Sequence, residues 1–126
     1  MKIILLTGPK ASENTATINE VYKQLTQVMI NPPPQQKLSY SHNDFECLVP
    51  HEKGYVALFS LGSTLERMYE AIINYSIAHC LIMTHTDQNG SEWTGFLNCI
   101  RECPQHTVIT KTANNNADCQ SIIDSI

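Results

Sequence analysis

Short apolar runs alternate along the chain with segments whose apolar residues recur at helical spacing. Four runs bounded by glycine, proline or polar clusters predict buried strands at residues 1–8, 55–59, 78–84 and 107–110. A fifth, weaker extended piece is expected around residues 37–40. Helices are predicted at residues 65–75, 93–102 and 118–126, and a short one at 44–49. Another helix follows the first strand, with Ser12 or Asn14 as its cap and Asn31–Pro34 as its end.

This alternation of strands and helices is typical of an α/β fold with right-handed crossovers. We expect a single domain spanning residues 1–126. Its predicted architecture is a small doubly wound, Rossmann- or flavodoxin-like parallel sheet of four or five strands, with helices on both faces. Ligands of such folds bind beyond the carboxyl ends of the strands. The loops at residues 8–14, 60–64 and 84–90 are therefore the expected place for function.

Composition narrows the class of partner. The chain has 126 residues and a formal net charge of -4, which disfavours a protein that binds a nucleic-acid polymer. No apolar run approaches the roughly 20 residues of a membrane span, and the first is too short for a signal peptide. The five cysteines are odd in number and form no CxxC pair, which favours reduced thiols and a cytoplasmic location.

Three common site motifs are not supported. The first loop begins as a P-loop would, but Glu13 and Asn14 replace the glycine and lysine that hold phosphates. A single phosphate could still be received there by backbone amides, Lys10 and Ser12, although an ordinary tight connection explains the loop equally well. Cys99, Cys103 and His106 lack a fourth zinc ligand, and no GxSxG nucleophile elbow is present. We expect no metal and no cofactor.

Glu66 is the most informative acidic residue. It falls in the first turn of a helix that begins just after a predicted inner strand. The helix dipole favours an ionised carboxylate there, which suits a nucleophile. A first-turn glutamate that helps cap the helix, with Ser63 or Thr64 as N-cap, is the structural alternative.

The segments Lys2–Pro9 and Ser60–Glu66, together with Asp44, resemble the nucleoside 2-deoxyribosyltransferase superfamily. The similarity is closest to its 2'-deoxynucleoside 5'-monophosphate N-glycosidase branch. It extends over most of the chain, and the spacing from Ser60 to Glu66 is its most specific part. The resemblance implies hydrolysis of the N-glycosidic bond of a deoxynucleotide within a homodimer. The helix at residues 65–75, which is apolar on more than one face, fits such an assembly.

The resemblance also implies roles for individual residues. Glu66 would attack C1' of the deoxyribose, Asp44 would assist departure or protonation of the base, and Ser60 would face the 5' end of the sugar. A hydroxyl at this position tolerates a phosphate, which favours a nucleotide over a nucleoside. The residues expected to bind substrate are Gly8, Pro9, Lys10, Ser12, Ser60, Gly62, Ser63, Ser91 and Thr94.

Other positions depart from the family pattern. Leu5 replaces a tyrosine, Gly54 replaces an acidic residue, and the first loop has no second glycine. These departures keep two alternatives open, namely deoxyribosyl transfer between bases and a nucleotide-binding or interaction module without chemistry. Trp93 and Tyr40 are candidates for stacking on a base, or for ordinary structural aromatics.

Overall fold

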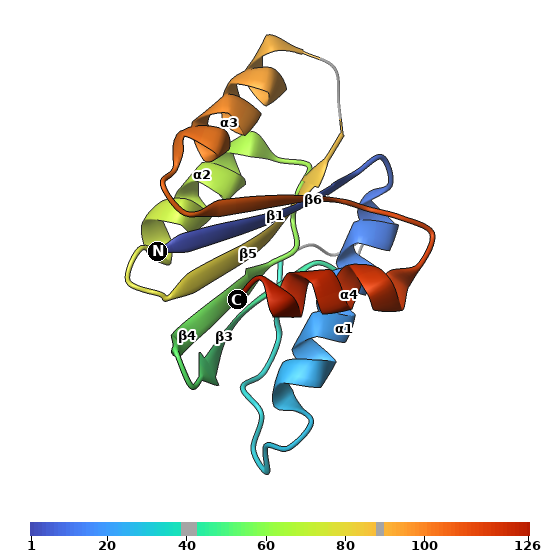
Figure 1. Ribbon diagram of the computed structural model, residues 1–126, viewed down its shortest axis with the longest axis vertical. Helices are drawn as coiled ribbons and strands as arrows, with labels where there is room; N and C mark the ends of the chain where they lie inside the picture. Colours follow the sequence, from blue (N-terminus) through green and yellow to red (C-terminus); the bar gives the residue numbers. More distant parts are fainter. Residues whose placement is uncertain (39–42, 88–89) are drawn as a thin grey trace.

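The computed structural model describes residues 1–38, 43–87 and 90–126 and contains one sheet flanked by helices (Figure 1). The strands, in the spatial order β2-β3-β4-β5-β1-β6, form a six-stranded sheet. The elements in chain order are β1 (Lys2–Gly8), α1 (Ala11–Thr26), β2 (Gln36–Lys37), β3 (Phe45–His51), β4 (Gly54–Phe59), α2 (Leu65–Asn74), β5 (Cys80–Thr86), α3 (Ser91–Glu102), β6 (His106–Thr110) and α4 (Asn115–Asp124).

The sheet is mixed. β1 pairs in parallel with both β5 and β6, and β4 pairs in parallel with β5. β3 runs antiparallel to β4, and the two-residue β2 runs antiparallel to β3. The expected α/β class is therefore confirmed, but the sheet has six strands rather than four or five and is not wholly parallel. The connection that follows β1, through α1, leads to β2 at the far edge of the sheet and not to a strand beside β1. β5 lies between β4 and β1.

β3 accounts for the largest error in the predicted elements, because a short helix was expected at residues 44–49. Phe45, Cys47 and Val49 are buried and alternate with more exposed residues, which is the period of a strand. A two-residue turn then joins β3 to β4, and Gly54 supplies the positive φ of 124° that follows it. Pairing with β4 thus decides the conformation of a segment whose local pattern was ambiguous.

Helices cover both faces of the sheet (Figure 1). On one face α1 and α4 pack against Ile4 and Leu6 of β1, together with buried residues of β3 to β5. On the other face α2 and α3 pack against Ile3 and Leu5 of the same strand. Alternate residues of the central strand therefore supply two separate cores, which explains its nearly continuous apolar sequence.

The helix ends differ from the sequence-based expectation. α1 begins at Ala11, so Ser12 and Asn14 lie inside it, and its N-cap Lys10 makes no side-chain cap hydrogen bond. The helix ends at Thr26, ahead of the proline segment. That segment instead folds back on α1, where the Tyr22 hydroxyl donates to the Pro33 carbonyl at 2.7 Å.

Two further features concern membrane spans and the cysteines. No helix in the described ranges is both long enough and apolar enough to cross a membrane. All five cysteines are free, and Cys47, Cys80 and Cys119 are buried. Burial raises the pKa of the Cys80 thiol to about 11, so this core cysteine stays protonated at neutral pH.

Candidate functional site

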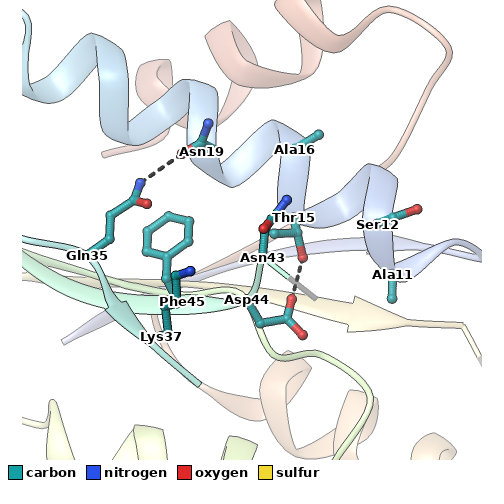
Figure 2. Close-up of a pocket in the computed structure, with 10 residues that line it drawn as sticks. All are labelled: Ala11, Ser12, Thr15, Ala16, Asn19, Gln35, Lys37, Asn43, Asp44 and Phe45. Carbon is teal, nitrogen blue, oxygen red and sulfur yellow. Dashed lines mark hydrogen bonds between the residues drawn. The ribbon is translucent and has the colours of Figure 1, made fainter. Parts of the chain in front are cut away.

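A cavity of about 540 Å³ opens between α1 and the start of β3 (Figure 2). This volume lies within the usual range for small-molecule sites. Because β3 runs antiparallel to β4, its first residues lie at the edge where the parallel strands end, which we call the carboxyl edge. The lining of this α1–β3 cavity consists of Ala11, Ser12, Thr15, Ala16, Asn19, Gln35, Lys37, Asn43, Asp44 and Phe45.

Asp44 is the acidic residue of the lining and is only 3% exposed. Its Oδ1 accepts a hydrogen bond of 2.6 Å from the Thr15 hydroxyl of α1 (Figure 2). The Ser60 hydroxyl lies 3.5 Å from the same oxygen. A short bond to a carboxylate is among the stronger hydrogen bonds in proteins, so it holds the start of β3 against α1.

Amide groups line the other end of the cavity. Gln35 Nε2 donates to Asn19 Oδ1 at 2.8 Å and ties the segment before β2 to the middle of α1 (Figure 2). Phe45 is buried and packs edge-on against Tyr22, with 6.0 Å between ring centroids. Lys37 on β2 contributes a cation to the lining. The cavity therefore offers hydroxyls, amides, one aromatic ring and a charge of each sign.

The loop after β4 is pinned to the neighbouring strands. The Ser60 hydroxyl accepts a 2.8 Å bond from the Phe45 N–H, and the Thr84 hydroxyl donates to the Ser60 carbonyl at 2.6 Å. The Gly62 carbonyl accepts from Thr86 N at 2.8 Å. A Cβ on Gly62 would lie 2.5 Å from the Thr84 carbonyl oxygen, so only glycine fits this approach. The Ser60 hydroxyl is thus hydrogen-bonded to the main chain at the point where β3 and β4 meet.

Glu66 lies outside the lining of the α1–β3 cavity. It is exposed in the first turn of α2, and Ser63 just before the helix is exposed as well. The N-cap of α2 is Thr64, whose side chain makes no cap hydrogen bond. The structure therefore brings Asp44 and Ser60 together and leaves the predicted nucleophile exposed on a different helix, outside the cavity lining.

Of the first-loop residues that were predicted to bind substrate, Ser12 lines the cavity. Lys10 is exposed and lies 3.7 Å from Glu13 in a surface ion pair, and Pro9 is also exposed. Gly8 is buried at the end of β1. A Cβ on it would lie 2.7 Å from Asn14 Oδ1. The conformation of this loop is therefore set by close packing of Gly8.

The predicted residues of α3 lie on the other face of the sheet. Ser91 and Thr94 are exposed in its first turn, where the Thr94 hydroxyl donates to the Gly90 carbonyl at 3.2 Å. Trp93 is half-buried and packs edge-on against His85, with centroids 5.1 Å apart. This contact explains the tryptophan as a structural aromatic. Tyr40, the other candidate for base stacking, lies outside the described residues.

His85 is a buried polar residue in this aromatic environment. It stacks on Phe96, and its Nδ1 lies 2.9 Å from the Thr7 hydroxyl. Its Nε2 is buried and finds no hydrogen-bond partner within the described parts of the chain. Burial lowers the pKa of His85, and this effect outweighs the opposing charge of Asp87. The ring is therefore neutral at pH 7.

A second buried carboxylate joins α4 to the end of β6. Asp118 accepts a 2.7 Å bond from Lys111 Nζ, a 2.9 Å bond from Thr112 N and a 2.8 Å bond from the Thr112 hydroxyl. Burial alone would raise the pKa of Asp118, but these hydrogen bonds and the Lys111 charge lower it overall. This carboxylate has all its partners within the chain and plays a structural role.

Several lining residues were not identified from the sequence, namely Thr15, Asn19, Gln35, Lys37, Asn43 and Phe45. One usable signal was present. Ser12, Thr15 and Asn19 follow the spacing i, i+3, i+7, which places small polar residues along one side of α1 beside its apolar stripe. Gln35 and Lys37 carry no local signal of this kind, because they reach the cavity through the fold of the proline segment.

No protein-family model, curated protein or solved structure matches this chain. Among the residues that the structure describes, no three histidine, cysteine, aspartate or glutamate side chains gather closely enough to hold a metal ion. The lining of the α1–β3 cavity presents hydroxyls, amides, a lysine and a carboxylate.

Proposed function

We propose that this chain holds a 2'-deoxynucleoside 5'-monophosphate in the α1–β3 cavity and hydrolyses its N-glycosidic bond. The main support for the proposal is the position of Asp44, a residue that the sequence analysis singled out. Asp44 lines a cavity of suitable size and contacts Ser60. Cavities beyond the carboxyl ends of the parallel strands are where α/β domains bind ligands.

The lining matches the parts of such a ligand. Lys37 and Ser12 supply a cation and a hydroxyl for the phosphate, and the start of α1 adds backbone N–H groups and a favourable dipole. Phe45 and the amides of Asn19 and Asn43 provide an apolar surface and hydrogen-bonding groups for the base. A net charge of -4 is compatible with one bound phosphate because Lys37 places a positive charge in the cavity lining itself.

The proposed reaction requires the deoxyribose to project out of the cavity to Glu66, which lies outside its lining. There the Glu66 carboxylate attacks C1' and the bond from C1' to the base nitrogen breaks. The electron pair leaves with the base, which takes a proton from a water molecule that the Asp44 carboxylate orients. The resulting hydroxide attacks C1', and the Glu66 carboxylate is released together with 2-deoxyribose 5-phosphate. This division between a nucleophile and an acid–base group is the one that retaining glycosidases use.

Release of free base from the four common deoxynucleoside monophosphates tests the hydrolysis. Glu66→Gln should lower turnover about 10³-fold or more while leaving nucleotide affinity in place, because it removes only the nucleophile. Glu92→Gln is the matched control, since Glu92 is also a first-turn glutamate, in α3. Full activity of Glu66→Gln would refute this mechanism. A second free base, added to the reaction, would reveal transfer through formation of a new nucleoside.

A second candidate is nucleotide binding without chemistry, which the exposed position of Glu66 outside the cavity lining favours. It predicts a measurable Kd in calorimetry that Asp44→Ala abolishes, and no release of base over hours. Turnover that depends on Glu66 would exclude it. The two candidates thus share a binding site and differ only in what Glu66 does.

The wider proposal is a doubly wound domain that acts as a homodimer in the cytoplasm. The four parallel strands with helices on both faces support the first part. The homodimer is the assembly that the family resemblance implies. The five free cysteines fit a reducing compartment.

A further inference from the structure

The two edges of the sheet are protected to different degrees. On the β3 edge, Ser60 N donates to the Phe45 carbonyl, so Phe45 and every second residue after it bond to β4. The outward positions are then Glu46, Leu48 and Pro50. β2 covers the first of them, and proline at the last has no N–H to expose. This edge therefore offers little to an incoming strand.

The β6 edge has no such protection. Ile3 N donates to the Gln105 carbonyl and Lys111 N donates to the Thr7 carbonyl, so odd-numbered residues of β6 bond to β1. The main-chain groups of His106, Val108 and Thr110 then point away from the sheet. Within the described ranges, these groups have no main-chain or side-chain partner. An uncovered strand edge of this kind is a template for pairing with another strand.

We propose that a second copy of this chain covers the β6 edge, with the two β6 strands antiparallel about a two-fold axis at Val108. In this register His106 faces the partner's Thr110 and Val108 faces its own copy, so that all the outward N–H and C=O groups are paired. About six hydrogen bonds would join the two sheets into one continuous sheet of both subunits.

The side chains favour self-pairing over pairing with a strand of another kind. In the proposed register Thr107 lies opposite Ile109 of the other copy, and Val108 opposite Val108, so most cross-strand pairs are β-branched. Val108 and Ile109 are only half-buried in one subunit. None of the residues His106–Thr110 is Asp, Glu, Lys or Arg, so two copies with a net charge of -4 can meet here without opposing like charges.

Two double variants that change the same two positions test the register by sedimentation equilibrium without nucleotide. His106→Lys with Thr110→Lys places lysines opposite each other twice in the dimer. His106→Lys with Thr110→Glu places opposite charges there instead. The first should dissociate about tenfold or more readily than the second. Equal dimerisation of the two double variants would overturn the proposal.

Single variants then distinguish a dimer contact at the β6 edge from one at another exposed surface. Val108→Pro removes an outward N–H from each copy, whereas Val108→Thr keeps it, so only the proline variant should dissociate, by about tenfold or more. Circular dichroism reports whether each variant is folded, and a variant that fails is replaced by the charge pair above. Ile73→Lys on α2 should leave the dimer intact. A monomeric wild type at 100 micromolar, or dissociation by Ile73→Lys alone, would refute the β6 interface and leave the hydrolysis proposal untouched.

Discussion

Near the carboxyl edge, the two faces of the sheet are packed with different kinds of side chain. On the α1 and α4 face, buried polar side chains hold the elements together, as in the bond from Thr15 to Asp44 and the ion pair of Lys111 with Asp118. On the α2 and α3 face, the same level is filled by the rings of His85, Trp93 and Phe96. The α1–β3 cavity lies on the polar face.

This difference shows where ligand chemistry is available. A buried polar network fixes donors and acceptors in place, and a cavity beside it can present them to a bound molecule. Aromatic packing excludes water and stabilises the fold but leaves few groups for recognition. Glu66 begins a helix of the aromatic face and stays exposed, so the two proposed catalytic residues belong to differently built regions. Variants on each face can break or sharpen this contrast.

The largest expected effect concerns the buried ion pair of the polar face. Asp118→Asn leaves the Lys111 ammonium, whose side chain is only 7% exposed, without its counter-charge. Breaking such a pair should lower the free energy of unfolding by about 3–5 kcal/mol in urea titrations. Glu13→Gln is the control, because the pair of Glu13 with Lys10 is exposed on both sides and should matter by less than about 1 kcal/mol. Equal losses would contradict the polar network as a stabilising feature.

A smaller loss is expected where the loop after β4 meets β5. Gly62→Ala places a Cβ against the Thr84 carbonyl, which cannot move without disturbing the strand, and should lower the free energy of unfolding by about 1–3 kcal/mol. Gly95→Ala in α3 is the control, since nothing lies within 4 Å of its added Cβ. That variant should instead stabilise the protein by about 0.5–1 kcal/mol. If both variants change the free energy of unfolding in the same direction, the contact of position 62 with the Thr84 carbonyl does not exclude a Cβ.

Most of the fold could be predicted because strong local patterns decide it. β1, β4, α2 and β5 lie within a few residues of their predicted ranges, since apolar runs and helical spacing agree there with the final packing. β3 could not be predicted in the same way. Its alternation of Phe45, Cys47 and Val49 is short and interrupted by Pro50, and it becomes a strand through pairing with β4.

The candidate site was predictable only in part for a related reason. Asp44 and Ser60 were selected from sequence and lie together, although through a strand that was expected to be a helix. Lys37 and Gln35 reach the cavity because the chain returns after α1, and no local pattern encodes that return. The exposure of Glu66 depends on how α2 sits on the sheet, which helical periodicity alone does not specify.

A finer test of the polar face uses two threonines of the same helix. Thr15→Val removes the donor to Asp44 and should cost about 1–2 kcal/mol of unfolding free energy. It should also weaken nucleotide binding, because Asp44 lines the cavity. Thr17→Val removes a partly buried hydroxyl bond to Asn115, which lies away from the cavity lining, so its effect should be confined to stability. Calorimetry with a deoxynucleoside monophosphate separates the two, and equal affinities would place the ligand elsewhere.

The smallest effect is a difference in acid sensitivity between the faces. Burial lowers the pKa of His85 below its ordinary value of 6.5, so the unfolded state binds more protons as the pH falls towards that value. The stability that the neutral ring contributes is therefore fully present above about pH 6.5 and is lost progressively below it. His85→Gln should flatten the dependence of the unfolding free energy on pH between 7.5 and 5. Asp118, whose pKa is lowered from 3.8, should act only below about pH 4. A wild-type curve that is flat down to pH 5 would show that the aromatic face accommodates a charged imidazole.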